Sequence, residues 1–84
     1  MVFEVKWTRR AKRSLEKLER NIIIRIIKKV ESAKKNPYFY LKWLAGKKIW
    51  KLRIGNYRVL VDINTKKEIL YILEVGHRKN IYKK

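Results

Sequence analysis

The stretch that decides the fold reads Lys51-Leu52-Arg53-Ile54-Gly55-Asn56-Tyr57-Arg58-Val59-Leu60-Val61. Apolar residues alternate with polar ones on both sides of Gly55-Asn56, which predicts strands over residues 49–54 and 57–63. Glycine at the first central position suits a two-residue type II′ turn. If these two residues form the loop, Arg53 lies opposite Arg58 and Leu52 lies opposite Val59. The two strands then share one apolar face and one basic face.

The rest of the chain supplies the elements that cover the apolar face. Residues 2–7 alternate like a half-buried strand, and residues 68–75 are apolar on both faces, as in a central strand. Thr8 can cap an amphipathic helix over residues 9–19. Asn21 then opens a second helix, which ends at about Lys35 because Pro37 follows. The prediction is an α+β fold: an N-terminal strand, an αα-hairpin, then a three-stranded antiparallel meander, with the helices on one face of the sheet.

Composition narrows the function. The 84 residues carry 24 Lys and Arg against 7 Asp and Glu, a net charge of +17, with one histidine and no cysteine. Disulfides and thiolate metal sites are excluded, and no acidic cluster has ligand-like spacing, so we expect no metal or other cofactor. The longest apolar run is Ile69–Leu73, too short for a membrane span. We expect a soluble, cytoplasmic domain that binds anions.

The hairpin register brings cations together on the face that the helices leave open. Lys51, Arg53 and Arg58 share this face, and Arg78 leaves the last strand with the same parity as Glu74. Like charges directly across a strand pair destabilise it, and a bound phosphate would offset that cost. Asp62 and Glu74 are the nearby acids whose negative charge could offset this repulsion instead. The alternative is an ordinary solvated strand face. The expected floor of the open face is apolar: Leu60, Leu70 and Ile72.

Two motifs carry a resemblance to a known family. Residues 51–61, together with the run from Val75 to Tyr82 (Val-Gly-His-Arg-Lys-Asn-Ile-Tyr), resemble the RelE/ParE superfamily of toxin–antitoxin toxins. The opening strand, the helix containing Ala11, Asn36-Pro37 and residues 44–46 also fit, so the resemblance covers residues 1–84 as a single RelE-like domain. It implies a ribosome-dependent endoribonuclease that cuts mRNA in the ribosomal A site. It also implies a cognate acidic, RelB-like antitoxin, bound in a heterodimer or heterotetramer.

The resemblance also assigns an active site: Lys51, Arg53, Arg58, Arg78 and Tyr82. Arg53 stands where the best-known RelE toxin has a second lysine; it keeps the charge but stays protonated. ParE relatives act on DNA gyrase and lack the full basic and tyrosine set. A ParE-like gyrase inhibitor and a non-catalytic basic RNA-binding domain remain the alternatives.

Each of these residues can be given a chemical role. Cleavage by the RNA 2′-hydroxyl needs a base, donors for the charge on phosphorus, and an acid for the leaving oxygen. The arginines can donate hydrogen bonds to the phosphate oxygens on which negative charge builds. Lys51 is the candidate base because crowding by cations disfavours its charged form. Tyr82 can stack on a base or assist proton transfer. His77 is a weaker candidate acid, since strand alternation points it away from Arg78.

Two further groups of residues have ordinary explanations. The cations of the helices are expected to form a solvated face, which can still dock on ribosomal RNA phosphates. The aromatic stretch from Tyr38 to Trp43 is expected to pack in the core and loops rather than to stack on bases.

Overall fold

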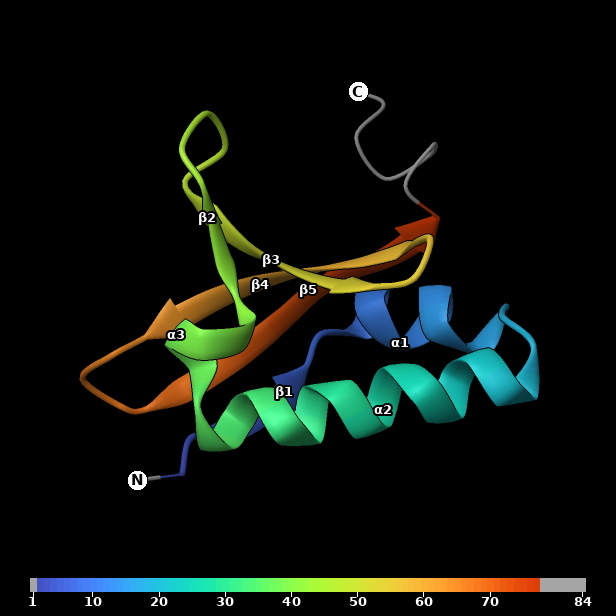
Figure 1. The fold of residues 1–84 in the computed structure, drawn as a ribbon, viewed down its shortest axis with the longest axis horizontal. Coiled ribbons are helices and arrows are strands. Elements are labelled where there is room, and N and C mark those ends of the chain that lie inside the picture. The colour runs from blue at the N-terminus through green and yellow to red at the C-terminus, as the bar shows by residue number, and fades with distance from the viewer. Residues whose placement is uncertain (1, 78–84) are drawn as a thin grey trace.

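A computed structural model describes residues 2–77. Five strands form one sheet in the order β1-β5-β4-β3-β2, in which β1 runs parallel to β5 and the other pairs are antiparallel (Figure 1). The elements in chain order are β1 (Glu4–Trp7), α1 (Arg9–Glu16), α2 (Arg20–Lys35), α3 (Pro37–Tyr40), β2 (Lys42–Leu44), β3 (Ile49–Ile54), β4 (Tyr57–Asn64) and β5 (Ile69–His77). The α+β prediction is confirmed, with β5 in the interior of the sheet as expected.

The core lies between the sheet and α2. Ile26, Val30 and Ala33 of α2 are almost completely buried, and so are Leu52 and Val59 on the sheet face that α2 covers. The longest helix therefore lies along one face of the sheet, as Figure 1 shows. Burying such side chains stabilises the fold by roughly 1.5–3 kcal/mol each before entropy is counted.

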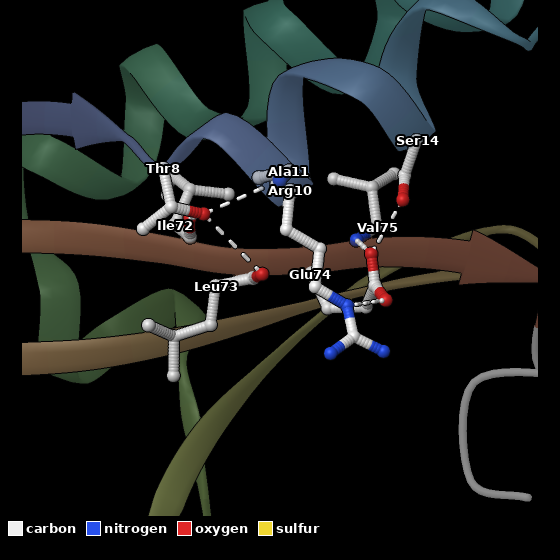
Figure 2. A network of polar contacts seen from close by, with 8 residues as sticks. All are labelled: Thr8, Arg10, Ala11, Ser14, Ile72, Leu73, Glu74 and Val75. Atoms are coloured by element: carbon white, nitrogen blue, oxygen red, sulfur yellow. Dashed lines mark hydrogen bonds and ion pairs between the residues drawn. The ribbon is translucent and has the colours of Figure 1, made fainter.

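Thr8 and Glu74 fix α1 against β5 (Figure 2). The Thr8 hydroxyl accepts a hydrogen bond from the Ala11 N–H, which caps α1, and donates one to the Ile72 carbonyl at 2.7 Å. At the other end of α1, Ser14 donates to the Glu74 carboxylate at 2.5 Å. β1 pairs with residues 69–72 of β5, and α1 contacts β5 beyond the end of β1, at Glu74.

One part of the predicted open face is wrong. Leu70 and Ile72 lie in the helix-covered core, each 1% exposed, rather than beside the cations. The cause is a β-bulge: Leu60 pairs with Glu74 but Val61 pairs with Ile72, so one residue of β5 is skipped. An extra residue reverses the alternation of the strand. Leu60 does lie on the open face, as the partner of Lys51.

Several boundaries also differ from the prediction. The first helix ends at Glu16 rather than residue 19, and α2 begins at Arg20 with Glu19 as its N-cap rather than at Asn21. The aromatic stretch forms the one-turn helix α3 and the edge strand β2 instead of loop. Among residues 2–77, no helix has the length and apolar character needed to cross a membrane.

Candidate active site on the open face of the β3–β4 hairpin

The hairpin has the predicted register. Arg53 pairs with Arg58, Leu52 with Val59 and Ile54 with Tyr57. Gly55 takes the positive φ of 58° that the first position of a type II′ turn requires. Lys51, Arg53 and Arg58 therefore occupy one face of the sheet, opposite α2.

Arg58 is the most constrained of the three cations. It is only 8% exposed, and one terminal nitrogen (Nη1) donates to the carbonyl oxygens of Gly55 and Tyr57, both at 3.2 Å. Its Nε is buried and has no hydrogen-bond acceptor among residues 2–77. Burying a charge without an opposite charge is costly, and such a cost points to a site that receives an anion. The hairpin carbonyls hold the guanidinium in place for it.

The other two cations are more accessible. Arg53 is exposed and Lys51 is half-buried. Lys51 also lies next to Lys42, its partner on β2. Lys42 is a further cation of this face, and the prediction missed it because a three-residue strand is too short to show alternation.

The nearby acids do not neutralise this cluster. Among residues 2–77 the ion pairs are Arg10–Glu74 and Lys34–Glu31, so Lys51, Arg53 and Arg58 have none. Glu74 instead forms an ion pair with Arg10 and accepts a hydrogen bond from Ser14, both on α1. Partial burial raises the pKa of Glu74, but hydrogen bonds from Ser14, Arg10 and the Val75 N–H, with the charge of Arg10, outweigh burial and hold that pKa below its usual value.

His77 is not part of the cluster. It pairs with Tyr57 across the β4–β5 ladder, and the two rings meet edge-on with centroids 5.5 Å apart. Tyr57 is on the face opposite to Arg58, so His77 points away from the Arg58 guanidinium. The residue opposite Arg58 on β5 is Gly76, which places no side chain beside it.

Arg78 and Tyr82 lie outside the described residues, so their roles stay predictions. Within residues 2–77, no three histidine or acidic side chains gather where they could hold a metal ion. The chemistry available to this part of the chain is that of lysine and arginine: binding phosphate and stabilising negative charge.

Comparison with known proteins identifies the family. The model for the ParE toxin of the type II toxin–antitoxin system parDE matches residues 5–82. The chain belongs to this toxin family. No curated protein sequence matches it.

Solved structures of RelE toxins have the same fold. The RelBE2 toxin–antitoxin complex of Mycobacterium tuberculosis contains a chain with a TM-score of 0.86 and 27% identity, and the match covers 93% of this chain and 100% of that one. For the RelE–RelB complex of Pyrococcus horikoshii the TM-score is 0.78 at 21% identity, and the match covers 95% of this chain and 99% of that one. For a mutant of Escherichia coli RelE in the free state the TM-score is 0.77 at 21% identity, and the match covers 96% of this chain and 88% of that one. The RelE/ParE superfamily prediction is confirmed, and the protein is a toxin of a type II toxin–antitoxin system.

Proposed function

We propose that this toxin is a ribosome-dependent endoribonuclease that cleaves mRNA in the ribosomal A site and so inhibits translation. The observation that carries the proposal is Arg58, a buried guanidinium with no acidic partner among residues 2–77, set opposite Arg53 on the open face. Its cognate partner is an acidic, RelB-like antitoxin, and it acts in the cytoplasm, where ribosomes and mRNA are.

The site fits cleavage by the RNA's own 2′-hydroxyl. The 2′-oxygen forms a bond to phosphorus, and the bond from phosphorus to the 5′-oxygen breaks as that oxygen takes a proton from water. The products are a 2′,3′-cyclic phosphate and a 5′-hydroxyl. Arg58 and Arg53 donate to the non-bridging oxygens as negative charge builds on them. Lys51 takes the proton of the 2′-hydroxyl, because a lysine amine can accept a proton whereas the arginines beside it stay protonated.

The C-terminal residues complete this assignment. Arg78 adds a further donor to the phosphate, and Tyr82 stacks on the base next to the cleaved bond. His77, which points to the other face, has no part in the reaction.

A second candidate function is inhibition of DNA gyrase. The match to the ParE toxin model favours it, because ParE relatives act on gyrase. The uncompensated cluster on the open face favours the ribonuclease, since a protein inhibitor has no need of a buried, unpaired arginine.

Two assays separate the candidates. Purified toxin is incubated with programmed ribosomes carrying a defined A-site codon, and the mRNA ends are mapped by primer extension. The same preparation is tested for inhibition of gyrase supercoiling. The proposal predicts A-site cuts and unchanged supercoiling; supercoiling inhibition without cuts would establish the gyrase inhibitor. RNA binding with neither activity would leave the non-catalytic RNA-binding domain.

A further inference from the structure

Half of one edge of the sheet is open. The short strand β2 pairs with residues 49–51 of β3, so within the described part of the chain residues 52–54 have no strand beside them on that side. Two hollows lie along this edge, one of about 440 Å³ between α2 and the hairpin and one of about 300 Å³ beside α3. Lys29 and Arg53 line both hollows, which therefore adjoin each other, and we call the two together the edge groove.

The edge groove is lined by basic side chains from three elements. Among residues 2–77, no acidic side chain lines its two hollows, and six cations do: Arg25, Lys28, Lys29, Lys42, Lys51 and Arg53. Two of them, Lys51 and Arg53, belong to the candidate active site. The groove therefore leads from the open face around the edge of the sheet to α2.

Two contacts position cations on the α2 side of the groove. A terminal nitrogen of Arg25 lies 3.3 Å from the point where a Cβ on Gly55 would be, so the absence of a side chain at Gly55 leaves room for the Arg25 guanidinium beside the turn. The ammonium of Lys29 lies 5.4 Å from the centre of the Tyr40 ring, a cation–π contact that orients it.

An exposed aromatic ring ends the groove. Phe39 lines the smaller hollow and is 73% exposed, whereas aromatic side chains that serve a core are buried. The expectation that the aromatic stretch packs in the core and loops is therefore wrong at Phe39, and Tyr38 and Trp43 are also exposed, at 55% and 51%. Its ring meets that of Tyr40 edge-on with centroids 4.9 Å apart, which supports it from one side.

We propose that the edge groove binds single-stranded RNA next to the cleavage site, with its cations on consecutive phosphates and Phe39 stacked on a base. This inference rests on the proposed function for the identity of the RNA but not for the groove itself. Proteins bind single-stranded nucleic acid through a groove of cations that follows the phosphates and through exposed aromatic rings on which the bases stack. An acidic peptide strand is the competing occupant of this edge, and the exposed ring of Phe39 favours RNA over it because a base can stack on the ring.

The test measures binding rather than cleavage. A fluorescent 2′-O-methyl oligoribonucleotide, which cannot be cut through its 2′-oxygen, is titrated with toxin at several salt concentrations and followed by anisotropy. The variant Arg25→Ala/Lys28→Ala removes two exposed cations that have no place in the catalytic cluster. The control Lys66→Ala/Lys67→Ala removes the same charge from the exposed turn between β4 and β5.

The groove predicts a specific pattern of results. The groove variant loses at least about 10-fold in affinity at low salt, and its slope of log affinity against log salt falls by about 1.4, since each phosphate contact to a single strand contributes about 0.7. Phe39→Ala weakens binding about 5-fold or more without changing that slope. Equal affinities for the groove variant and the control would overturn the inference.

Two outcomes separate this inference from the proposed function. If the toxin cuts no mRNA but the groove variant loses RNA affinity, the ribonuclease proposal fails and the groove stands. If cleavage is present and the groove variant loses antitoxin affinity alone, the groove is a peptide site and the RNA inference is overturned.

Discussion

Arg53 and Arg58 lie directly opposite each other on the two strands of one hairpin, and neither forms an ion pair among residues 2–77. Directly opposed side chains in a sheet have Cβ atoms roughly 4.5–5.5 Å apart, where like charges destabilise the pair. The repulsion between the two arginines adds to the cost of burying the Arg58 guanidinium. Destabilising arrangements of this kind are typical of functional sites.

Replacing Arg58 tests that trade directly. We expect Arg58→Met to raise the free energy of unfolding by about 1–2 kcal/mol, because an apolar side chain of similar length removes the buried, unpaired charge. Urea unfolding followed by circular dichroism measures the change. Arg53→Met is the control, since Arg53 is exposed and its removal should shift stability by no more than about 0.5 kcal/mol. A less stable Arg58→Met protein would show that the two carbonyl contacts of Arg58 outweigh its burial.

The turn that sets the register gives a second prediction. Gly55→Ala should destabilise the toxin by about 1–2 kcal/mol, because a residue with a Cβ is strained at a φ of 58° and the new methyl group meets Arg25. Gly46→Ala is the matched control, since a Cβ there meets no atom within 4 Å. Thermal unfolding of both variants checks the difference. Equal melting temperatures would mean that the turn does not need its glycine.

The carboxylate that anchors α1 makes stability depend on pH. The folded-state pKa of Glu74 is lowered, so its contribution is complete above the unfolded pKa of about 4.3 and disappears as the pH falls through the folded value. Glu74→Gln should therefore cost stability at pH 7 and less at pH 3. Unfolding in urea at both values measures this.

Two further variants provide stability changes with which the loss in Glu74→Gln can be compared. Ser14→Ala removes one hydrogen bond and should cost about 1 kcal/mol at pH 7. Glu31→Gln affects only the ion pair with Lys34 on α2 and should change stability by less than about 0.5 kcal/mol. A pH-independent loss in Glu74→Gln would contradict the assigned role of its charge.

The sequence predicts the parts of this fold in which local patterns dominate. The Gly55-Asn56 turn fixes the hairpin, and a period of two then places Arg53 and Arg58 on one face. The spacing of Ile23, Ile26, Ile27, Val30 and Ala33 predicts an apolar stripe on the second helix. Ile26, Val30 and Ala33 are buried as predicted, whereas Ile27 is 41% exposed.

Features that depend on distant contacts were not predictable in this way. The bulge in β5 turns Leu70 and Ile72 inward, and nothing in a run of apolar residues marks where a strand skips a residue. The parallel pairing of β1 with β5 joins opposite ends of the chain. The edge groove exists because β2 covers only part of β3, and its cations on α2 look like any solvated helix face.

The central claim is that the cluster around Arg58 cleaves RNA, and ribosome-dependent cleavage by Arg58→Ala tests it most directly. Arg58→Ala, Arg58→Lys and the surface control Lys66→Ala are compared on programmed ribosomes, after circular dichroism has shown that each is folded. We predict a loss of at least about 100-fold in the rate of A-site cleavage for Arg58→Ala, partial recovery in Arg58→Lys, and no change in the control. Undiminished cleavage by folded Arg58→Ala would contradict the claim.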